Sequence, residues 1–190
     1  QGFTIRINDR KILKAMAAYS GFPEEAYDEV FIILDKMDKI GLEGVEEELV
    51  KAGYEKEKAE KYLELYREVT PDLAGIRYLK EKLTGFLDPK CAEDLETIIT
   101  SVEAVKTADF KLVFDPTLVR GMSYYTGPIF EISIDGFGGS VGGGGRYDEM
   151  IGRFTGQNTP ACGFSVGFER IVMLLLVKGY QIPSRKEKEA

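Results

Sequence analysis

Histidine and tryptophan are absent from the 190 residues, and cysteine occurs only twice. Without histidine the chain has no Ser-His-Asp or Cys-His catalytic arrangement, no HExxH zinc site and no histidine metal ligand. Cys91 and Cys162 lie 71 positions apart, so they form no CxxC pair, and we expect both to be reduced, buried thiols. These absences exclude catalysis by a histidine side chain and predict no metal site.

Long apolar segments are also missing. The longest aliphatic run, Ile171–Val177, has seven residues, whereas a membrane-spanning helix needs roughly 20. No charged start followed by an apolar core and a cleavage site is present, which predicts a cytoplasmic protein without membrane contact. The chain opens directly into a strand-like pattern and ends in a linker-like one, so we expect a piece of a longer protein.

Charge and glycine are unevenly distributed. The chain carries 25 basic and 32 acidic side chains, a net charge of −7, which argues against an overall basic, polyanion-binding surface. Residues 1–107 contain 16 basic and 23 acidic side chains, whereas residues 108–190 contain nine of each. Residues 121–179 hold 14 of the 21 glycines. This contrast predicts an acidic helical block followed by a glycine-rich block that contains strands.

The first block has a helical pattern after one initial strand. Residues 3–7 alternate as a half-buried strand does, and Asn8 or Asp9 then caps a helix that ends near Gly21. Pro23 fits the first turn of the next helix. Further helices are predicted over residues 41–52, 56–69, 72–84 and 91–107. Within the second of these, Ala59, Tyr62, Leu63 and Tyr66 form a stripe that predicts a packed core.

The second block changes to a strand periodicity. Residues 110–114, 129–134 and 161–166 each predict a strand. The helix predicted over residues 168–178 is apolar nearly all round, so we expect it to be buried.

Three segments of this second block contain residues suited to binding. Arg120 stands close to Tyr124 and Tyr125; a guanidinium fork suits a carboxylate or phosphate, and tyrosine offers a flat face with a hydroxyl. Taken alone, this segment fits an ordinary surface loop equally well. The run Gly142–Gly145, followed by Tyr147, allows close approach of a ligand or of another strand, although it also fits a flexible turn.

The third segment places Glu169 and Arg170 in the first turn of the last helix. The positive end of the helix dipole disfavours an arginine there unless an anion is close by. Either a bound phosphate or a salt bridge supplies such an anion, and the local sequence does not separate them.

Together these segments resemble the histidyl-tRNA synthetases, a family of class II aminoacyl-tRNA synthetases. Residues 118–132, LVRGMSYYTGPIFEI, resemble the first histidine-specific signature of that family. Residues 142–150, GGGGRYDEM, resemble its second conserved block. Residues 160–175, PACGFSVGFERIVMLL, resemble class II motif 3. The opening FTIRINDRKIL and the helical block resemble the strand and insertion domain that precede the first signature.

The resemblance implies an α+β fold, namely part of a class II synthetase antiparallel sheet flanked by helices, with an inserted all-helical domain. Residues 1–9 and 108–181 would form a partial catalytic core, residues 10–107 the helical insertion domain, and residues 182–190 a linker. The implied activity is that of a histidine–tRNA ligase, which joins histidine to ATP as histidyl-adenylate and then transfers the histidyl group to tRNA(His).

The resemblance also implies roles for particular residues. Arg120 would be the catalytic residue, binding the histidine carboxylate and the α-phosphate. The imidazole pocket would be lined by Tyr124, Tyr125, Tyr147 and the glycines Gly143, Gly144 and Gly145. Arg170 and Glu169 would bind ATP, accompanied by Mg²⁺, and the helical block would lie over the acceptor arm of tRNA.

The chain departs from the family pattern in two ways. Ser123 replaces the usual aspartate of the first signature, and class II motifs 1 and 2 are missing, together with the anticodon-binding domain. Because motif 1 builds the family's homodimer and motif 2 much of the adenine site, the isolated chain should be inactive. Two alternatives are a histidine-binding paralogue, such as the regulatory subunit of ATP phosphoribosyltransferase, and a synthetase-like module that senses tRNA. Arg120 and Arg170 together favour the ligase.

Overall fold

The computed structural model describes residues 2–119 and 124–180. Its elements follow in the order β1 (Phe3–Asp9), α1 (Arg10–Tyr19), η1 (Glu24–Ala26), α2 (Tyr27–Leu34), α3 (Met37–Lys51), α4 (Lys56–Glu68), α5 (Leu73–Lys82), α6 (Pro89–Val105), β2 (Lys111–Phe114), β3 (Pro128–Ile134), β4 (Ser140–Arg146), α7 (Asp148–Thr155), β5 (Cys162–Val166) and α8 (Phe168–Val177).

The described strands form one five-stranded sheet in the order β2-β1-β3-β4-β5. The expected antiparallel pairing occurs between β1 and β3, β3 and β4, and β4 and β5, whereas β1 and β2 pair in parallel. A parallel pair needs a long crossover connection, and here the helical block provides it. The mixed α+β fold is therefore confirmed, with one parallel edge pair.

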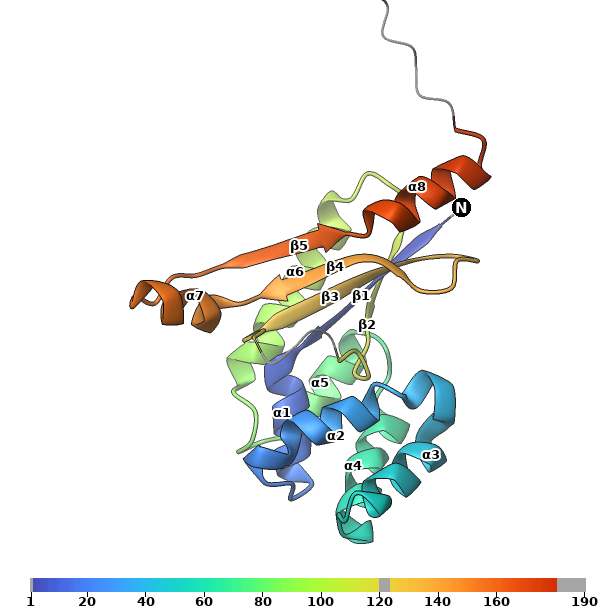
Figure 1. Cartoon of the computed structure of the whole chain (residues 1–190). Helices are drawn as coiled ribbons and strands as arrows, with labels where there is room; N and C mark the ends of the chain where they lie inside the picture. The colour runs from blue at the N-terminus through green and yellow to red at the C-terminus, as the bar shows by residue number, and fades with distance from the viewer. Residues whose placement is uncertain (1, 120–123, 181–190) are drawn as a thin grey trace, which may run out of the picture.

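The helices from α1 to α5 gather on one side of the sheet, and α6 runs behind it (Figure 1). Asp9 caps α1, because its side chain accepts a hydrogen bond of 2.8 Å from the Lys11 amide. The predicted stripe on α4 forms part of the core: Ala59, Tyr62 and Leu63 are fully buried. One hydrophobic cluster joins these helices to the sheet through Ile7, Phe114, Leu118, Tyr125 and Ile129. The boundaries expected for the helical insertion domain stay a prediction.

Local expectations in the first block need two changes. Pro23 precedes the short 3-10 helix η1, and only then does α2 begin. The helix predicted from residue 41 starts earlier, at Met37, and Gly41 interrupts it with a φ of 68°. That left-handed conformation is accessible to glycine at little cost, so the interruption is encoded at this residue.

Larger corrections concern the second block. The glycine run is not a flexible turn but the strand β4, paired on both sides. Helix α8 was expected to be buried, yet none of its residues is. Its neighbours in the described chain cover little of it, and Val177 is 86% exposed. Cys91 is buried as expected, but Cys162 on the edge strand β5 is exposed. Helix α7, at the opposite end of β5 from α8, was not predicted (Figure 1).

No helix in the described part of the chain has the length and apolar character required to cross a membrane.

Candidate functional site

The strand register gives the sheet one distinctly polar face. Thr4, Arg6 and Asn8 alternate with apolar residues along β1, and they pair with Ser133, Glu131 and Ile129 of β3. Glu131 pairs in turn with Gly143, and Ile129 with Gly145. Because side chains on paired positions point to the same face, the glycines of β4 leave this face bare beside Glu131.

Two predicted tyrosines approach a pair of neighbouring glycines on this face. Gly145 of β4 lies opposite Gly163 of β5. A Cβ atom on Gly145 would come within 2.9 Å of Cδ1 of Tyr125, and one on Gly163 within 2.7 Å of the Tyr147 hydroxyl oxygen. The fold therefore brings Tyr125 and Tyr147 to adjacent positions where only glycine fits without rearrangement.

The remaining members of the predicted pocket flank this pair. Tyr124 packs on Tyr125, with ring centroids 4.3 Å apart, and is 37% exposed. Gly143 and Gly145 lie on the polar face, whereas Gly144 belongs to the opposite face. Arg120 and Ser123 lie outside the described residues.

Arg170 and Glu169 lie at the other end of β4. The Arg170 guanidinium donates a hydrogen bond to the carbonyl oxygen of Ser140, the first residue of β4. Gly145 lies five residues further along, about 17 Å away at the usual rise of a strand. Both charged side chains are exposed. The structure thus separates the predicted phosphate-binding arginine from the tyrosine pair by most of the length of β4.

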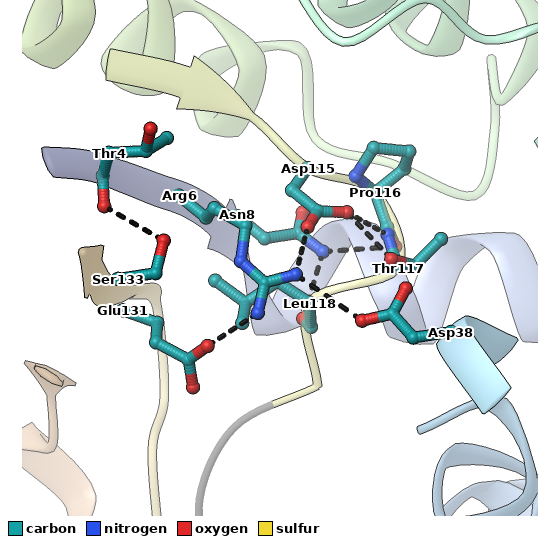
Figure 2. A network of polar contacts seen from close by, with 10 residues as sticks. All are labelled: Thr4, Arg6, Asn8, Asp38, Asp115, Pro116, Thr117, Leu118, Glu131 and Ser133. Atoms are coloured by element: carbon teal, nitrogen blue, oxygen red, sulfur yellow. Dashed lines mark hydrogen bonds and ion pairs between the residues drawn. The ribbon is translucent and has the colours of Figure 1, made fainter. Parts of the chain in front are cut away.

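A polar network that the sequence pattern did not reveal lies around Arg6 on the polar face (Figure 2). Arg6 donates to the carboxylates of Glu131 and Asp115, the latter at 3.1 Å, and lies 3.5 Å from a carboxylate oxygen of Asp38. Burial by itself would lower the pKa of the Arg6 guanidinium, but the bond to Glu131 and the surrounding carboxylates outweigh it and the pKa is raised. The alternation of Thr4, Arg6 and Asn8 along β1 was the available signal.

An open cleft of about 780 Å³ occupies the opposite face, at the end of β1. It is lined by residues that include Asp9, Cys91 and Arg146. Burial raises the pKa of the Asp9 carboxyl to about 6, opposed in part by the hydrogen bond from the Lys11 amide. Burial likewise raises the pKa of the Cys91 thiol, with the Asp9 charge adding to the effect. From the sequence, Asp9 is predicted only as a helix cap.

Comparisons with known proteins agree along almost the whole chain. The profile of the histidyl-tRNA synthetase family matches residues 1–171. A histidine–tRNA ligase from Leifsonia xyli subsp. xyli is 45% identical over 90% of this chain, and a cytoplasmic histidine–tRNA ligase from Arabidopsis thaliana is 35% identical over 91%. This chain spans 41% of the length of the Leifsonia protein and 20% of that of the Arabidopsis protein.

Solved structures give the same fold. The crystal structure of histidyl-tRNA synthetase from Nostoc sp. PCC 7120 matches 95% of this chain with a TM-score of 0.79 and 30% identity, and this chain covers 43% of it. A structure titled as an ATP phosphoribosyltransferase regulatory subunit/histidyl-tRNA synthetase from Bacillus halodurans matches with a TM-score of 0.67 at 23% identity, which shows a shared fold alone.

The sheet and the helices around it thus have the fold of an aminoacyl-tRNA synthetase. Within that class, the chain belongs to the histidyl-tRNA synthetase family.

Proposed function

We propose that this chain is a portion of a histidine–tRNA ligase that uses ATP to form histidyl-adenylate and transfers the histidyl group to tRNA(His). The observation that carries the proposal is the approach of Tyr125 and Tyr147 to the paired glycines Gly145 and Gly163. In this proposal the full-length parent protein is a cytoplasmic homodimer, and the isolated chain is inactive because the rest of the active site lies outside it.

The tyrosines would select histidine by its ring. An imidazole seated between Tyr124, Tyr125 and Tyr147 finds flat apolar faces and phenolic hydroxyls able to bond to ring nitrogen. The bare backbone of Gly143 and Gly145 lets the substrate approach the sheet closely. An amino acid that leaves a buried hydroxyl unpaired is rejected by a factor of about 10⁴.

The reaction itself needs no protein base, because the histidine carboxylate is already an anion when it attacks the α-phosphate. Catalysis then consists of alignment and stabilisation of charge as pyrophosphate leaves. Arg120 would bind the carboxylate and the α-phosphate, while Arg170, with Glu169 beside it, would lie at the outer phosphates. The length of β4 supports this division, because about 17 Å of strand separates Ser140, which Arg170 contacts, from Gly145, which Tyr125 approaches.

Mg²⁺ would enter with ATP. Within residues 2–119 and 124–180, no group of three or more cysteine and acidic side chains is placed to bind a metal ion. Phosphate oxygens and water, which Mg²⁺ commonly retains as ligands, would therefore supply most of its coordination in this part of the protein.

The test is histidine-dependent exchange of pyrophosphate into ATP by the full-length parent protein. We expect exchange that requires histidine. Tyr147→Phe should raise the KM for histidine by about tenfold or more and change the KM for ATP by less than about twofold, because it removes only a hydroxyl at the tyrosine pair. Tyr66→Phe is the matched control, since it removes a hydroxyl that bonds to Tyr62 in the helical block.

Other outcomes identify the alternatives. Histidine binding without exchange would assign the protein to the regulatory paralogues. Binding of tRNA without binding of histidine would indicate a sensor module. Equal effects of Tyr147→Phe and Tyr66→Phe would remove Tyr147 from the histidine site.

A further inference from the structure

The segment that enters the first signature is fixed by the polar side chains of β1. Asn8 is fully buried, and its side-chain amide donates hydrogen bonds of 3.2 Å to the carbonyl oxygens of Pro116 and Leu118. The Oδ1 atom of the same Asn8 side chain accepts a 2.8 Å hydrogen bond from the Asp9 backbone amide. One side chain therefore satisfies two backbone carbonyls of a turn that is 110 residues away along the chain.

Arg6 adds a second tie to the same turn. It bonds to Asp115, whose carboxylate also accepts from the amide and the hydroxyl of Thr117, at 2.9 and 2.7 Å. Its other terminal nitrogen bonds to Glu131 on β3. The Arg6 fork thus links the turn to the strand that borders the bare glycine face (Figure 2).

Further along the signature, Thr126 and Gly127 are held by backbone hydrogen bonds. The Thr126 amide donates to the Arg146 carbonyl oxygen at 2.9 Å, and the Arg10 amide donates to the Gly127 carbonyl oxygen at 3.0 Å. The two places therefore differ. Strand pairing and α1 hold residues 126 and 127, whereas residues 115–118 are held by side chains of β1 in addition to a backbone bond from the Asp115 amide to the Ile7 carbonyl oxygen. A side-chain substitution on β1 can therefore loosen residues 115–118 and leave residues 126 and 127 in place.

We propose that Asn8 and Arg6 are positioning residues of the histidine site, which hold residues 115–118 in register with the polar face of the sheet. The inference rests on the proposed function and adds to it a set of residues that touch no substrate. Their effect on the reaction comes through geometry, since a displacement of about 1 Å at a reacting group can reduce a rate by about 10²-fold.

The asymmetry of buried hydrogen bonds makes Asn8 the sharper test. Asn8→Ala leaves the carbonyl oxygens of Pro116 and Leu118 without their donor, and a buried group in that state favours any shift that restores a partner. Asn8→Asp keeps the shape of the side chain, but its ionised carboxylate places acceptor oxygens against the carbonyl oxygens of Pro116 and Leu118. When protonated, that carboxyl donates one hydrogen bond again, and burial favours the protonated form.

The experiment measures pyrophosphate exchange and amide hydrogen exchange in the full-length parent, below the melting temperature of every variant. We expect Asn8→Ala to lower kcat by about tenfold or more. Amides in residues 117–119 should exchange faster while those of α4 remain protected. Asn8→Asp should regain at least about threefold in kcat, relative to the unmodified parent, between pH 8 and pH 6. Arg6→Lys should fall between the parent and Asn8→Ala, because it keeps the charge without the fork.

Ser20→Ala is the matched control, since Ser20 is also buried and bonds through its hydroxyl to the Met16 carbonyl oxygen within the helical block. A kcat within about twofold of the parent for Asn8→Ala, or an equal loss in Ser20→Ala, would overturn the proposal. Absence of histidine-dependent exchange in the unmodified parent would instead overturn the proposed function. Hydrogen exchange would then test only whether the β1 side chains hold residues 115–118. Unchanged protection of residues 117–119 in Asn8→Ala would refute that part of the proposal.

Discussion

The helical block and the carboxyl-terminal helices α7 and α8 both carry apolar residues but bury them very differently. In α4, Tyr62 and Leu63 are fully buried, and the cluster around them extends to the sheet. In contrast, no residue of α7 or α8 is buried, and Phe154 is 84% exposed. An apolar helix is buried only when a partner surface exists, and the described residues supply that surface to α4 but not to α8.

The strongest test of this difference is a matched pair of leucine truncations. Leu63→Ala should lower the free energy of unfolding by about 2–5 kcal/mol, because a fully buried side chain leaves a cavity. Leu176→Ala should change it by less than about 0.5 kcal/mol, because Leu176 is 69% exposed. Urea unfolding of this chain, followed by circular dichroism, measures both. Similar losses would show that α8 is packed after all.

A buried carboxyl gives the next largest expected effect. The pKa of Asp9 is raised to about 6 by burial, so the folded state takes up a proton more readily than the unfolded state. The free energy of unfolding of the protein therefore falls as the pH rises from about 4 to about 6. An asparagine at position 9 would still accept the capping hydrogen bond from the Lys11 amide. Asp9→Asn should stabilise by up to about 3 kcal/mol at pH 8 and by nothing at pH 3.

Urea unfolding of the parent chain and of Asp9→Asn across this pH range provides the measurement. A difference between the two that does not change with pH would mean that Asp9 titrates normally.

The smallest effect has the opposite sign and lies in the exposed region. Asp148 accepts a hydrogen bond of 2.7 Å from the Ala161 amide and pairs with Arg146, and these contacts lower its pKa. Its contribution to stability is therefore present above pH 3.8 and disappears as the pH falls through the lowered pKa. Asp148→Asn should cost about 0.5–1 kcal/mol at pH 7. A gain in stability, as expected for Asp9→Asn, would remove the contrast between the regions.

Local pattern predicted most elements, because their signals are contained within a few residues. The alternation of residues 3–7 identified β1, and the stripe around Tyr62 and Leu63 identified α4 and its buried side. Gly142–Gly145 was ambiguous because a glycine run has no periodicity of its own. It becomes a strand through pairing with β3 and β5, which a local pattern cannot contain.

In the candidate site, too, residues identified by a local motif were predicted, whereas residues with distant partners were not. The resemblance located Tyr125 and Tyr147 in the sequence, and the fold brings them to one pair of glycines. Asn8 and Arg6 were missed because their partners are far away in sequence: Arg6 and Glu131 are 125 residues apart. An alternating polar side chain on a strand indicates a solvated face as readily as a network, and only the register of β1 and β3 distinguishes them.

The position of β1 inside the sheet, between β2 and β3, also constrains the order in which the protein can fold. Both partners of this strand, β2 and β3, follow it only after the entire helical block, so on the ribosome β1 emerges long before either neighbour. Closing so long a loop is slow for an unstructured chain. A folded helical block shortens it, because α1 begins directly after β1 and α6 packs beside that strand. A helical block that folds first would therefore hold β1 close to the place where β2 and β3 later complete the sheet.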